Sequence, residues 1–394
     1  MKRLTTMAYL SSAFLPSRQA NAIQVMKMCN AFASLGVDLH LHALTPKPGP
    51  DTPREVDPLD FYGATAPFSL SIHPWSHFYK FRINELEALY RGWSQARQTL
   101  REGRDLVFGR SLEGCCFAAQ MGLPVIFETH QPPEAWGSTL FARHLLTKLI
   151  THPNLLGIVV ISQPLKRMYL SAFTLPQERV MVAPDAADPL PEMAEQETPA
   201  PLGLPERLQV GYVGHLYPGR GMEIIAGLAG SCPWADFHVV GGMSQDVDAW
   251  QKKLEKHDNL TFHGFLPPPE AENVRRGFDI TLAPYQRKIA VAGGGGDTSG
   301  YASPLKIFEY MALGKPMLVS DLPVLHEVLR GGENCLFCVP DDLSSWVGAL
   351  ERLRDDPDLA RRLEARALAD FLTRHTWQRR VEGILDHFGV GVGR

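Results

Sequence analysis

The chain has 394 residues, of which 45% are hydrophobic and 21% charged, and its formal net charge is −4. This is the profile of an ordinary globular protein with two or three domains and a full core. No block of like charge stands out, which argues against a nucleic-acid partner.

The first half of the chain alternates short apolar runs with amphipathic stretches, a pattern typical of an α/β fold with a parallel sheet. Polar residues at 5, 6, 11 and 12 break the first apolar run, so we expect a strand there and not a signal peptide. No apolar run reaches the ~18 residues of a membrane-spanning helix. The expected elements are a strand at 4–10, a helix at 22–35, a strand at 37–43, an irregular excursion at 45–75, a helix at 84–103, a strand at 105–109, a helix at 112–121, and strands at 124–128, 157–161 and 180–182.

Residues 184–207 are rich in proline and carry no periodic pattern, which predicts a linker. A second strand and helix series follows it. Its expected strands lie at 208–213, 237–240, 260–262, 279–282 and 317–319, and its expected helices at 222–229, 303–313, 343–353, 359–372 and 377–388. We therefore predict an N-terminal Rossmann-like domain (1–183), the linker (184–207), a C-terminal Rossmann-like domain (208–375) and a terminal helix (376–394).

The six cysteines are spread over the chain. Cys335 and Cys338 have C-x-x-C spacing, but a second pair is missing and their flanks are typical of a buried strand. We favour core cysteines over a zinc or redox site, and this usage suits a reducing cytoplasm.

A glycine-rich turn runs from Tyr212 to Gly221, between an expected strand and an expected helix. Small residues such as Gly214 let the backbone approach a ligand, and a helix N-terminus favours an anion. Arg220 adds a planar cation that suits phosphate. The alternative for this motif alone is a plain turn with a solvent-facing arginine.

A stronger signal begins with the four-glycine run at 293–296. Ser303 is expected to cap the next helix, with Pro304 in its first turn. Lys306 in that first turn opposes the helix dipole, which makes physical sense if an anion neutralises it. Glu309 could accept hydrogen bonds from ribose hydroxyls; the alternative is a surface Lys306–Glu309 pair.

In the N-terminal half, polar side chains follow the expected strands. His130 comes after the strand at 124–128 and is a candidate proton shuttle, although a lone histidine is more often structural. Arg110 follows another strand, and Arg18 with Asn21 lies in the first strand-to-helix loop. Ligands of open α/β sheets bind beyond the carboxyl ends of strands, so Arg18, Asn21 and Arg110 are candidates for the acceptor side. His130, Arg220 and Lys306 are the candidate catalytic residues.

Across nearly its whole length, the chain resembles the retaining glycosyltransferases of family 4, which have the two-domain GT-B fold. The motifs that carry the resemblance are Gly211-Tyr-Val-Gly-His-Leu with Arg220-Gly221, His263-Gly-Phe-Leu-Pro267, Ser303-Pro-Leu-Lys-Ile-Phe-Glu-Tyr-Met-Ala-Leu-Gly-Lys-Pro316, Ser320-Asp-Leu-Pro with Glu327, and Glu333-Asn334. The resemblance implies two doubly wound domains facing a cleft, with a terminal helix that crosses back onto the N-terminal domain.

The resemblance also implies roles for single residues. Arg220 and Lys306 would bind the donor diphosphate, helped by the amides from Leu305 onward. Glu309 would hold the ribose, Gly264 and Phe265 would border the base, and His130 would lie near the donor sugar. The anomeric configuration would be retained, and no metal or other cofactor would be required.

The sequence departs from the family pattern at two positions. The family often has a second glutamate eight positions before Glu309, where this chain has Tyr301. Backbone groups of Gly300, or the side chains of Asp297 and Thr298, are candidates to replace it. The usual arginine after Val213-Gly214 is His215, a candidate contact to the donor.

We therefore predict a retaining, hexosyltransferase-like glycosyltransferase that moves a sugar from a nucleotide diphosphate donor to an unidentified glycan, lipid or small-molecule acceptor. The predicted setting is polysaccharide biosynthesis in the cytoplasm. The alternatives are a nucleotide-sugar epimerase of related fold and a non-catalytic nucleotide-sugar-binding subunit. Aromatic and basic residues within 74–95 also suggest peripheral contact with the inner face of a membrane, against the simpler reading of a helix packed on its own domain.

Overall fold

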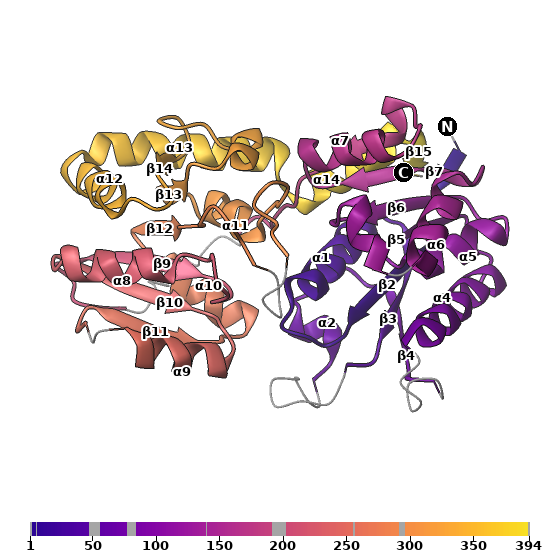
Figure 1. Cartoon of the computed structure of the whole chain (residues 1–394), viewed down its shortest axis with the longest axis horizontal. Helices are drawn as coiled ribbons and strands as arrows, with labels where there is room; N and C mark the ends of the chain where they lie inside the picture. Colours follow the sequence, from indigo (N-terminus) through magenta and orange to yellow (C-terminus); the bar gives the residue numbers. More distant parts are fainter. Residues whose placement is uncertain are drawn as a thin grey trace. The chain divides into compact units, whose positions relative to one another are not determined.

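A computed structural model describes residues 2–4, 6–46, 56–76, 84–138, 140–190, 202–254, 257–290 and 296–392. The chain divides into two compact units. Unit 1 comprises Met1–Asp185 and Trp377–Arg394, and unit 2 comprises Ala186–Thr376. Each unit is built around its own parallel sheet (Figure 1).

The sheet of unit 1 has seven parallel strands in the order β4-β3-β2-β5-β6-β7-β8. They are β2 (Thr6–Phe14), β3 (Asp38–Leu44), β4 (Ser69–His73), β5 (Leu106–Gly109), β6 (Val125–Thr129), β7 (Leu155–Val160) and β8 (Val180–Val182). The order reverses between β2 and β5, as in Rossmann folds, which bind ligands beyond the strand ends at such a point. A separate two-stranded sheet pairs β1 (Lys2–Leu4) with β15 (Val390–Val392).

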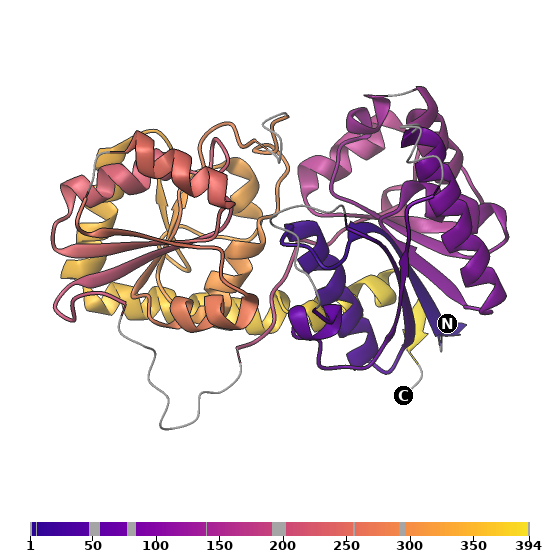
Figure 2. The same ribbon diagram turned by 90° about the horizontal axis from the view of Figure 1, so that it is seen from below.

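Helices cover both faces of this sheet (Figure 2), so strands such as β6 are buried along their whole length. The helices are α1 (Ala20–Ser34), α2 (Pro58–Phe61), α4 (Asn84–Arg101), α5 (Leu112–Gln120), α6 (Leu140–Ile150), α7 (Gln163–Ala172) and α14 (Trp377–His387). The C-terminal helix α14 packs against α1. Its buried face carries Trp377, Val381, Ile384 and Leu385, with Arg380 among them.

The sheet of unit 2 has six parallel strands in the order β11-β10-β9-β12-β13-β14. They are β9 (Leu208–Val213), β10 (Ala235–Val240), β11 (Leu260–Gly264), β12 (Ile280–Ala283), β13 (Met317–Ser320) and β14 (Leu336–Cys338). Numbered along the chain, this is the 3-2-1-4-5-6 order of a dinucleotide-binding sheet. The order reverses between β9 and β12.

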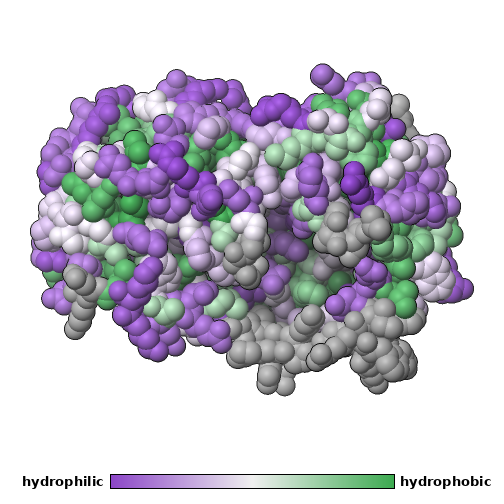
Figure 3. Space-filling model, viewed as in Figure 1, coloured by the Kyte–Doolittle hydropathy of each residue, from purple (hydrophilic) through white to green (hydrophobic). Residues whose placement is uncertain are grey.

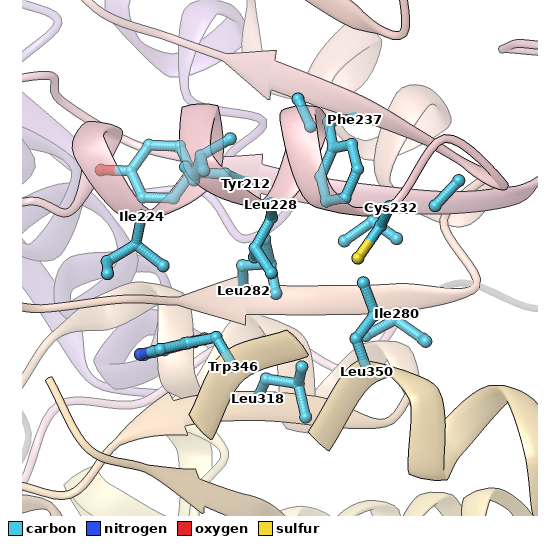
Figure 4. Packing of buried hydrophobic residues seen from close by; sticks show 14 of the residues in the cluster. Tyr212, Ile224, Leu228, Cys232, Phe237, Ile280, Leu282, Leu318, Trp346 and Leu350 are labelled. Carbon is cyan, nitrogen blue, oxygen red and sulfur yellow. The ribbon is translucent and has the colours of Figure 1, made fainter. Parts of the chain in front are cut away.

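The helices of unit 2 are α8 (Met222–Ser231), α9 (Ser244–Lys253), α10 (Pro268–Arg276), α11 (Leu305–Leu313), α12 (Leu343–Asp355) and α13 (Pro357–Arg374). One core cluster joins α8 and α12 to the sheet: Ile224 and Leu228 of α8 and Trp346 of α12 pack with Leu282 and Leu318 of the strands (Figure 4). A second cluster includes the buried residues of α11 and α13. The predicted α/β class with two Rossmann-like sheets is thus confirmed.

Several sequence expectations need correction. The stretch 45–75 is not irregular throughout, because it contains α2 and the strand β4. That strand lies at the edge of the sheet and is only partly buried. It can therefore contain serines, and its sequence lacks the apolar pattern by which strands are predicted. The first strand is longer than expected and is preceded by the separate strand β1. The expected linker at 184–207 lies partly outside the described residues, as does most of the glycine run.

Hydrophobic residues lie in small groups among hydrophilic ones on the face that Figure 3 shows. None of the described helices combines the length and the apolar character needed to cross a bilayer. All six cysteines are buried free thiols, as expected for core residues.

Candidate functional site

The first site is formed in unit 2, where the strand order reverses. Gly214 directly follows β9 at φ +148°, and its amide donates to the Val240 carbonyl at 2.9 Å. The φ at Gly214 is one that other residues rarely adopt, and a Cβ atom there would lie 2.8 Å from Lys306 Nζ, so glycine suits this position. The loop then runs through His215 and Arg220 into α8.

Lys306 lies in the first turn of α11. Pro304, and not Ser303, is the N-cap of this helix, and no side chain caps it, so the expected Ser303 cap is wrong. Lys306 is only 8% exposed. Its Nζ atom lies 3.6 Å from the centre of the Tyr212 ring and 5.1 Å from that of Tyr285. Both rings present their negative faces to the ammonium group.

Arg220 approaches the same ring, with its Cζ atom 5.6 Å from the centre of Tyr285. Its Nη2 makes a long bond of 3.4 Å to the Ala290 carbonyl. Within the described part of the chain, Arg220 Nε, Lys306 Nζ and His215 Nδ1 are buried and have no hydrogen-bond partner. Unpaired buried nitrogen is costly, so this arrangement is typical of a site whose partner is a ligand.

The electrostatics of these groups point to an anion. Burial, and then the charge of Arg220, hold the pKa of Lys306 well below its ordinary value, while Glu309 acts in the opposite direction. Burial also lowers the pKa of His215 to about 4, with further contributions from Arg220 and Lys306. Each group would regain its proton more easily beside a negative charge.

Glu309 does not pair with Lys306, so the alternative of a surface Lys–Glu pair is wrong. Its carboxylate instead forms an ion pair with Arg275, whose Nη1 atom lies 2.8 Å from Glu309 Oε2. Arg275 lies at the end of α10, and the sequence analysis did not identify it as a site residue. Glu309 remains partly exposed, with 31% of its side chain accessible.

The loop before α11 is held by Asp297. Its Oδ1 accepts hydrogen bonds from the amides of Ile289 and Ser299, at 3.0 and 2.9 Å. Thr298 Oγ1 donates to the Ile289 carbonyl at 3.3 Å. Both candidates for the missing glutamate therefore have local structural partners, whereas Gly300 is exposed and a Cβ atom there would meet nothing.

Two further predicted residues end a neighbouring strand. Gly264 is the last residue of β11, at φ +67°, and its carbonyl accepts from the Gly241 amide at 2.7 Å. Phe265 follows it and is half-buried. Since β11 lies beyond β10 in the sheet, these residues are two strands away from β9.

The second site is formed in unit 1, at the carboxyl end of β6. His130 Nε2 hydrogen-bonds Glu128 Oε1 at 2.7 Å, and the Glu128 side chain is fully buried. The same oxygen accepts from Gln24 Nε2 at 2.8 Å and from Arg380 Nη2 at 2.9 Å. Arg110 joins this network because its Nη1 donates to Gln24 Oε1 at 2.7 Å.

Charge balance explains the protonation states in this network. Burial alone would raise the pKa of Glu128, but Arg380, followed by His130, lowers it below its ordinary value. Burial, and then Arg110, lower the pKa of His130, which therefore stays neutral at neutral pH. A neutral imidazole whose Nε2–H donates to Glu128 leaves Nδ1 as the acceptor.

The other predicted residues of unit 1 lie near the switch point between β2 and β5. Arg18 is half-buried in the loop after β2, and Asn21 is exposed in the first turn of α1. Arg110 directly follows β5, and its amide donates to the Leu10 carbonyl at 2.8 Å.

Glu128 and Arg380, the two charged residues at the centre of this network, were not predicted from the sequence. Both could have been recognised in the sequence, since each is a charged residue within an otherwise apolar pattern. Glu128 interrupts a buried strand, and Arg380 occupies the stripe formed by Trp377, Val381 and Ile384.

The protein has two all-parallel Rossmann-like sheets, each with its own helices, which is the architecture of the GT-B fold. Comparison with known proteins agrees with this class. Residues 223–386 match the model of a family described as glycosyl transferase-like. The protein HepE of Anabaena, solved with UDP and glucose, superposes with a TM-score of 0.72 at 14% identity, covering 97% of this chain and 99% of HepE.

Two curated relatives match parts of the sequence. The O-antigen chain mannosyltransferase RfbU of Salmonella typhimurium is 46% identical over 50 residues, which are 13% of this chain and 14% of RfbU. The D-inositol 3-phosphate glycosyltransferase of Nocardia farcinica is 25% identical over 260 residues, covering 58% of this chain and 54% of that enzyme. The chain thus spans less than two thirds of the length of either relative.

Proposed function

We propose that this protein is a glycosyltransferase that uses a nucleotide diphosphate sugar as its donor. One observation carries the proposal: Lys306, Arg220 and His215 present buried, unpartnered nitrogen atoms at the strand-order reversal of unit 2. A diphosphate supplies the negative charge and the acceptor oxygens that these groups lack.

The local backbone favours the same ligand. Helix α11 begins at Leu305 without a side-chain cap, so its first amides are available to phosphate oxygens. Arg220 offers a planar fork and Lys306 a compact charge, which together suit two linked phosphates. Glu309 would bind the ribose hydroxyls, and it would then exchange some of its contact with Arg275 for the ligand.

The names of similar proteins support the class of reaction. Both curated relatives are glycosyltransferases by name, and HepE was also solved in complex with UDP-glucose. We therefore take UDP as the first nucleotide to test and a hexose as the transferred sugar. The acceptor in this proposal is a growing glycan or a small polyol.

We further propose that His130 contacts the transferred sugar, that the anomeric configuration is retained, and that transfer needs no metal or other cofactor. Gly300 is our preferred replacement for the absent glutamate, because Asp297 is engaged by two amides. The anomeric configuration of the product, determined by NMR in the presence of EDTA, tests retention and metal independence together.

The site assignment is tested by measuring UDP binding by calorimetry in the Arg220→Ala and Lys306→Met variants. Each charge-assisted hydrogen bond contributes about 1.5–3 kcal/mol, so the dissociation constant should rise about 10- to 100-fold in each variant. Lys253→Ala is the matched control, because this exposed lysine of unit 2 pairs with Glu223 and lies over the Trp250 ring, away from the site residues. Unchanged binding in both site variants would overturn the assignment.

Peripheral membrane contact remains a separate proposal. In the described part of the aromatic segment, Trp75 stacks on Phe14 and lies under Arg91, so it packs on its own unit. Tyr90 and Trp93 of α4 are exposed, at 45% and 36%. The segment 77–83 lies outside the described residues. Sedimentation with anionic vesicles, lost in a Tyr90→Ser, Trp93→Ser variant, is the expected result; no sedimentation of the wild type would refute the contact.

A further inference from the structure

A second cluster of polar side chains lies at the edge of the unit 1 sheet, where β3 and β4 run side by side (Figure 1). His40 and His42 alternate along β3 and so face the same side of the sheet. Glu102, directly after α4, and His73 of β4 complete the group, which we name the β3 histidine cluster. Three of its members meet at one point: one ring nitrogen each of His40 and His42 and a Glu102 carboxylate oxygen lie within 4.8 Å of one another.

The separations of these atoms fit a small divalent cation. Glu102 Oε2 lies 2.9 Å from His40 Nδ1 and 3.8 Å from His42 Nε2. Ligands of a tetrahedral Zn²⁺ with bonds of ~2.0–2.1 Å are about 3.3 Å apart, so these two separations lie about half an ångström below and above that value. The His40 and His42 rings are stacked at an interplanar angle of 13°, so they would also have to rotate to direct a nitrogen of each at one ion. The side chains of His40 and Glu102 are 13% and 20% exposed, which leaves a path for the ion.

The outer contacts of the cluster also match those of a metal site. Ligating histidines usually use their second ring nitrogen to bond another polar group, which fixes the ring. His40 Nε2 lies 2.8 Å from Ser71 Oγ, and His42 Nδ1 lies 3.0 Å from His73 Nε2. Gln98 Nε2 donates to the other Glu102 oxygen at 2.9 Å. Each of the three ligands is therefore oriented by a partner outside the ligand set.

The charge around the cluster leaves room for a cation. Arg104 Nε donates to Glu102 Oε2 at 3.3 Å, but the same guanidinium also pairs with Asp38 at 3.0 Å. Two carboxylates and one guanidinium give a net charge of −1 when the histidines are neutral. A divalent ion bound by these three ligands would change this net charge to +1, the same magnitude.

From this geometry we propose that His40, His42 and Glu102 bind one divalent transition-metal ion, with Zn²⁺ as the preferred ion. Two imidazoles and one carboxylate suit Zn²⁺ or Co²⁺ and disfavour Mg²⁺, which requires oxygen ligands. The ion would join β3 to the end of α4 and thereby stabilise the sheet edge.

This proposal does not depend on the proposed transferase activity. The cluster lies on β3, and β2 and β5 separate that strand from β6, whose carboxyl end carries His130. The transfer reaction is expected to need no metal, and a metal at β3 leaves that expectation unchanged.

The test uses the full chain, stripped with EDTA and dialysed. Calorimetry should show one Zn²⁺ bound per chain at micromolar affinity, Co²⁺ should give the visible absorption bands of a tetrahedral site, and Mg²⁺ should not bind. Zn²⁺ should raise the melting temperature by a few degrees, because it binds only the folded state. Glu102→Gln and His40→Gln should abolish binding, and Ser71→Ala should weaken it about 10- to 100-fold.

Because the chain has 14 histidines, adventitious binding needs a matched control. His326 and Asp321 form an exposed histidine–carboxylate pair at 2.7 Å in unit 2. Asp321→Asn should leave Zn²⁺ binding unchanged. The proposal is overturned if the wild type binds no Zn²⁺ at micromolar concentration, or if binding survives in Glu102→Gln with its fold confirmed by circular dichroism.

Discussion

At the scale of single residues, the burial of Lys306 indicates a ligand site. Burying its ammonium group costs free energy that no other group of the protein fully offsets. A buried ammonium over two tyrosine rings gains some cation–π stabilisation, about 2 kcal/mol when desolvated. That gain does not replace a counterion, and the nearby Arg220 adds repulsion. The lowered pKa of Lys306 is the result, and bound phosphate would reverse it.

This reasoning predicts that UDP binding takes up protons. Bound phosphate raises the pKa values of Lys306 and His215 from their depressed values, so affinity should fall as pH rises through the interval between the free and bound values. For His215 that interval starts at about pH 4. Calorimetry in buffers of different ionisation enthalpy measures the uptake directly.

The Lys306→Met variant provides the control for this measurement. It lacks the ammonium, so its proton uptake above neutral pH should be smaller than that of the wild type. Equal uptake in the two proteins would show that Lys306 does not change protonation on binding.

At the scale of the elements, α14 depends on one buried ion pair. Arg380 Nη2 and Glu128 Oε1 are 2.9 Å apart, with side chains 2% and 0% exposed. Arg380 also donates to the carbonyls of Ala183 and Pro184. This single side chain therefore joins α14 both to β6 and to the segment that follows β8. Removing one member of a buried pair leaves an uncompensated charge and typically costs about 3–5 kcal/mol.

We therefore predict that Arg380→Met lowers the free energy of unfolding of unit 1 by about 3–5 kcal/mol, measured by urea denaturation. The adjacent Arg379→Ala is the matched control, because Arg379 is 59% exposed and pairs with Glu382 at the surface. It should change stability only slightly. Adding Glu128→Gln to Arg380→Met should recover part of the loss, and equal effects of Arg379→Ala and Arg380→Met would contradict the assignment.

The sequence predicted the elements better than the contacts between them. Apolar periodicity located α11, α12 and α14 to within a few residues, because each buries one face. It missed β4, a partly polar edge strand, and it misplaced the α11 cap, because Ser303 precedes the cap position by one residue. The partners Glu128–Arg380 and Glu309–Arg275 were beyond its reach, since they join positions that only the folded chain brings together.

At the scale of the whole molecule, both units place several of their candidate residues by the same rule. In each sheet the strand order reverses once, and polar residues follow the strands on either side of that reversal. Arg220 follows β9 and Tyr285 follows β12 in unit 2, while Arg18 follows β2 and Arg110 follows β5 in unit 1. Because both sheets have this order, the position of a polar residue directly after a predicted strand was useful for predicting that it lies at a site.

Buried histidines predict how stability depends on pH. Burial lowers the pKa of both His238 and His375 to about 4, so each stays neutral in the folded protein while the unfolded chain titrates near pH 6.5. The unfolded state then binds more protons between about pH 6.5 and pH 4, and the free energy of unfolding must fall as the pH drops through this range.

Denaturant midpoints measured from pH 7 to pH 4 test this dependence. In the His375→Phe variant the decline should be shallower, because phenylalanine keeps the ring contact with Phe308 and cannot take up a proton. Saturating UDP should also flatten the decline, since bound phosphate lets the buried His215 accept a proton in the folded state. A decline unaffected by both His375→Phe and UDP would assign the acid sensitivity to other groups.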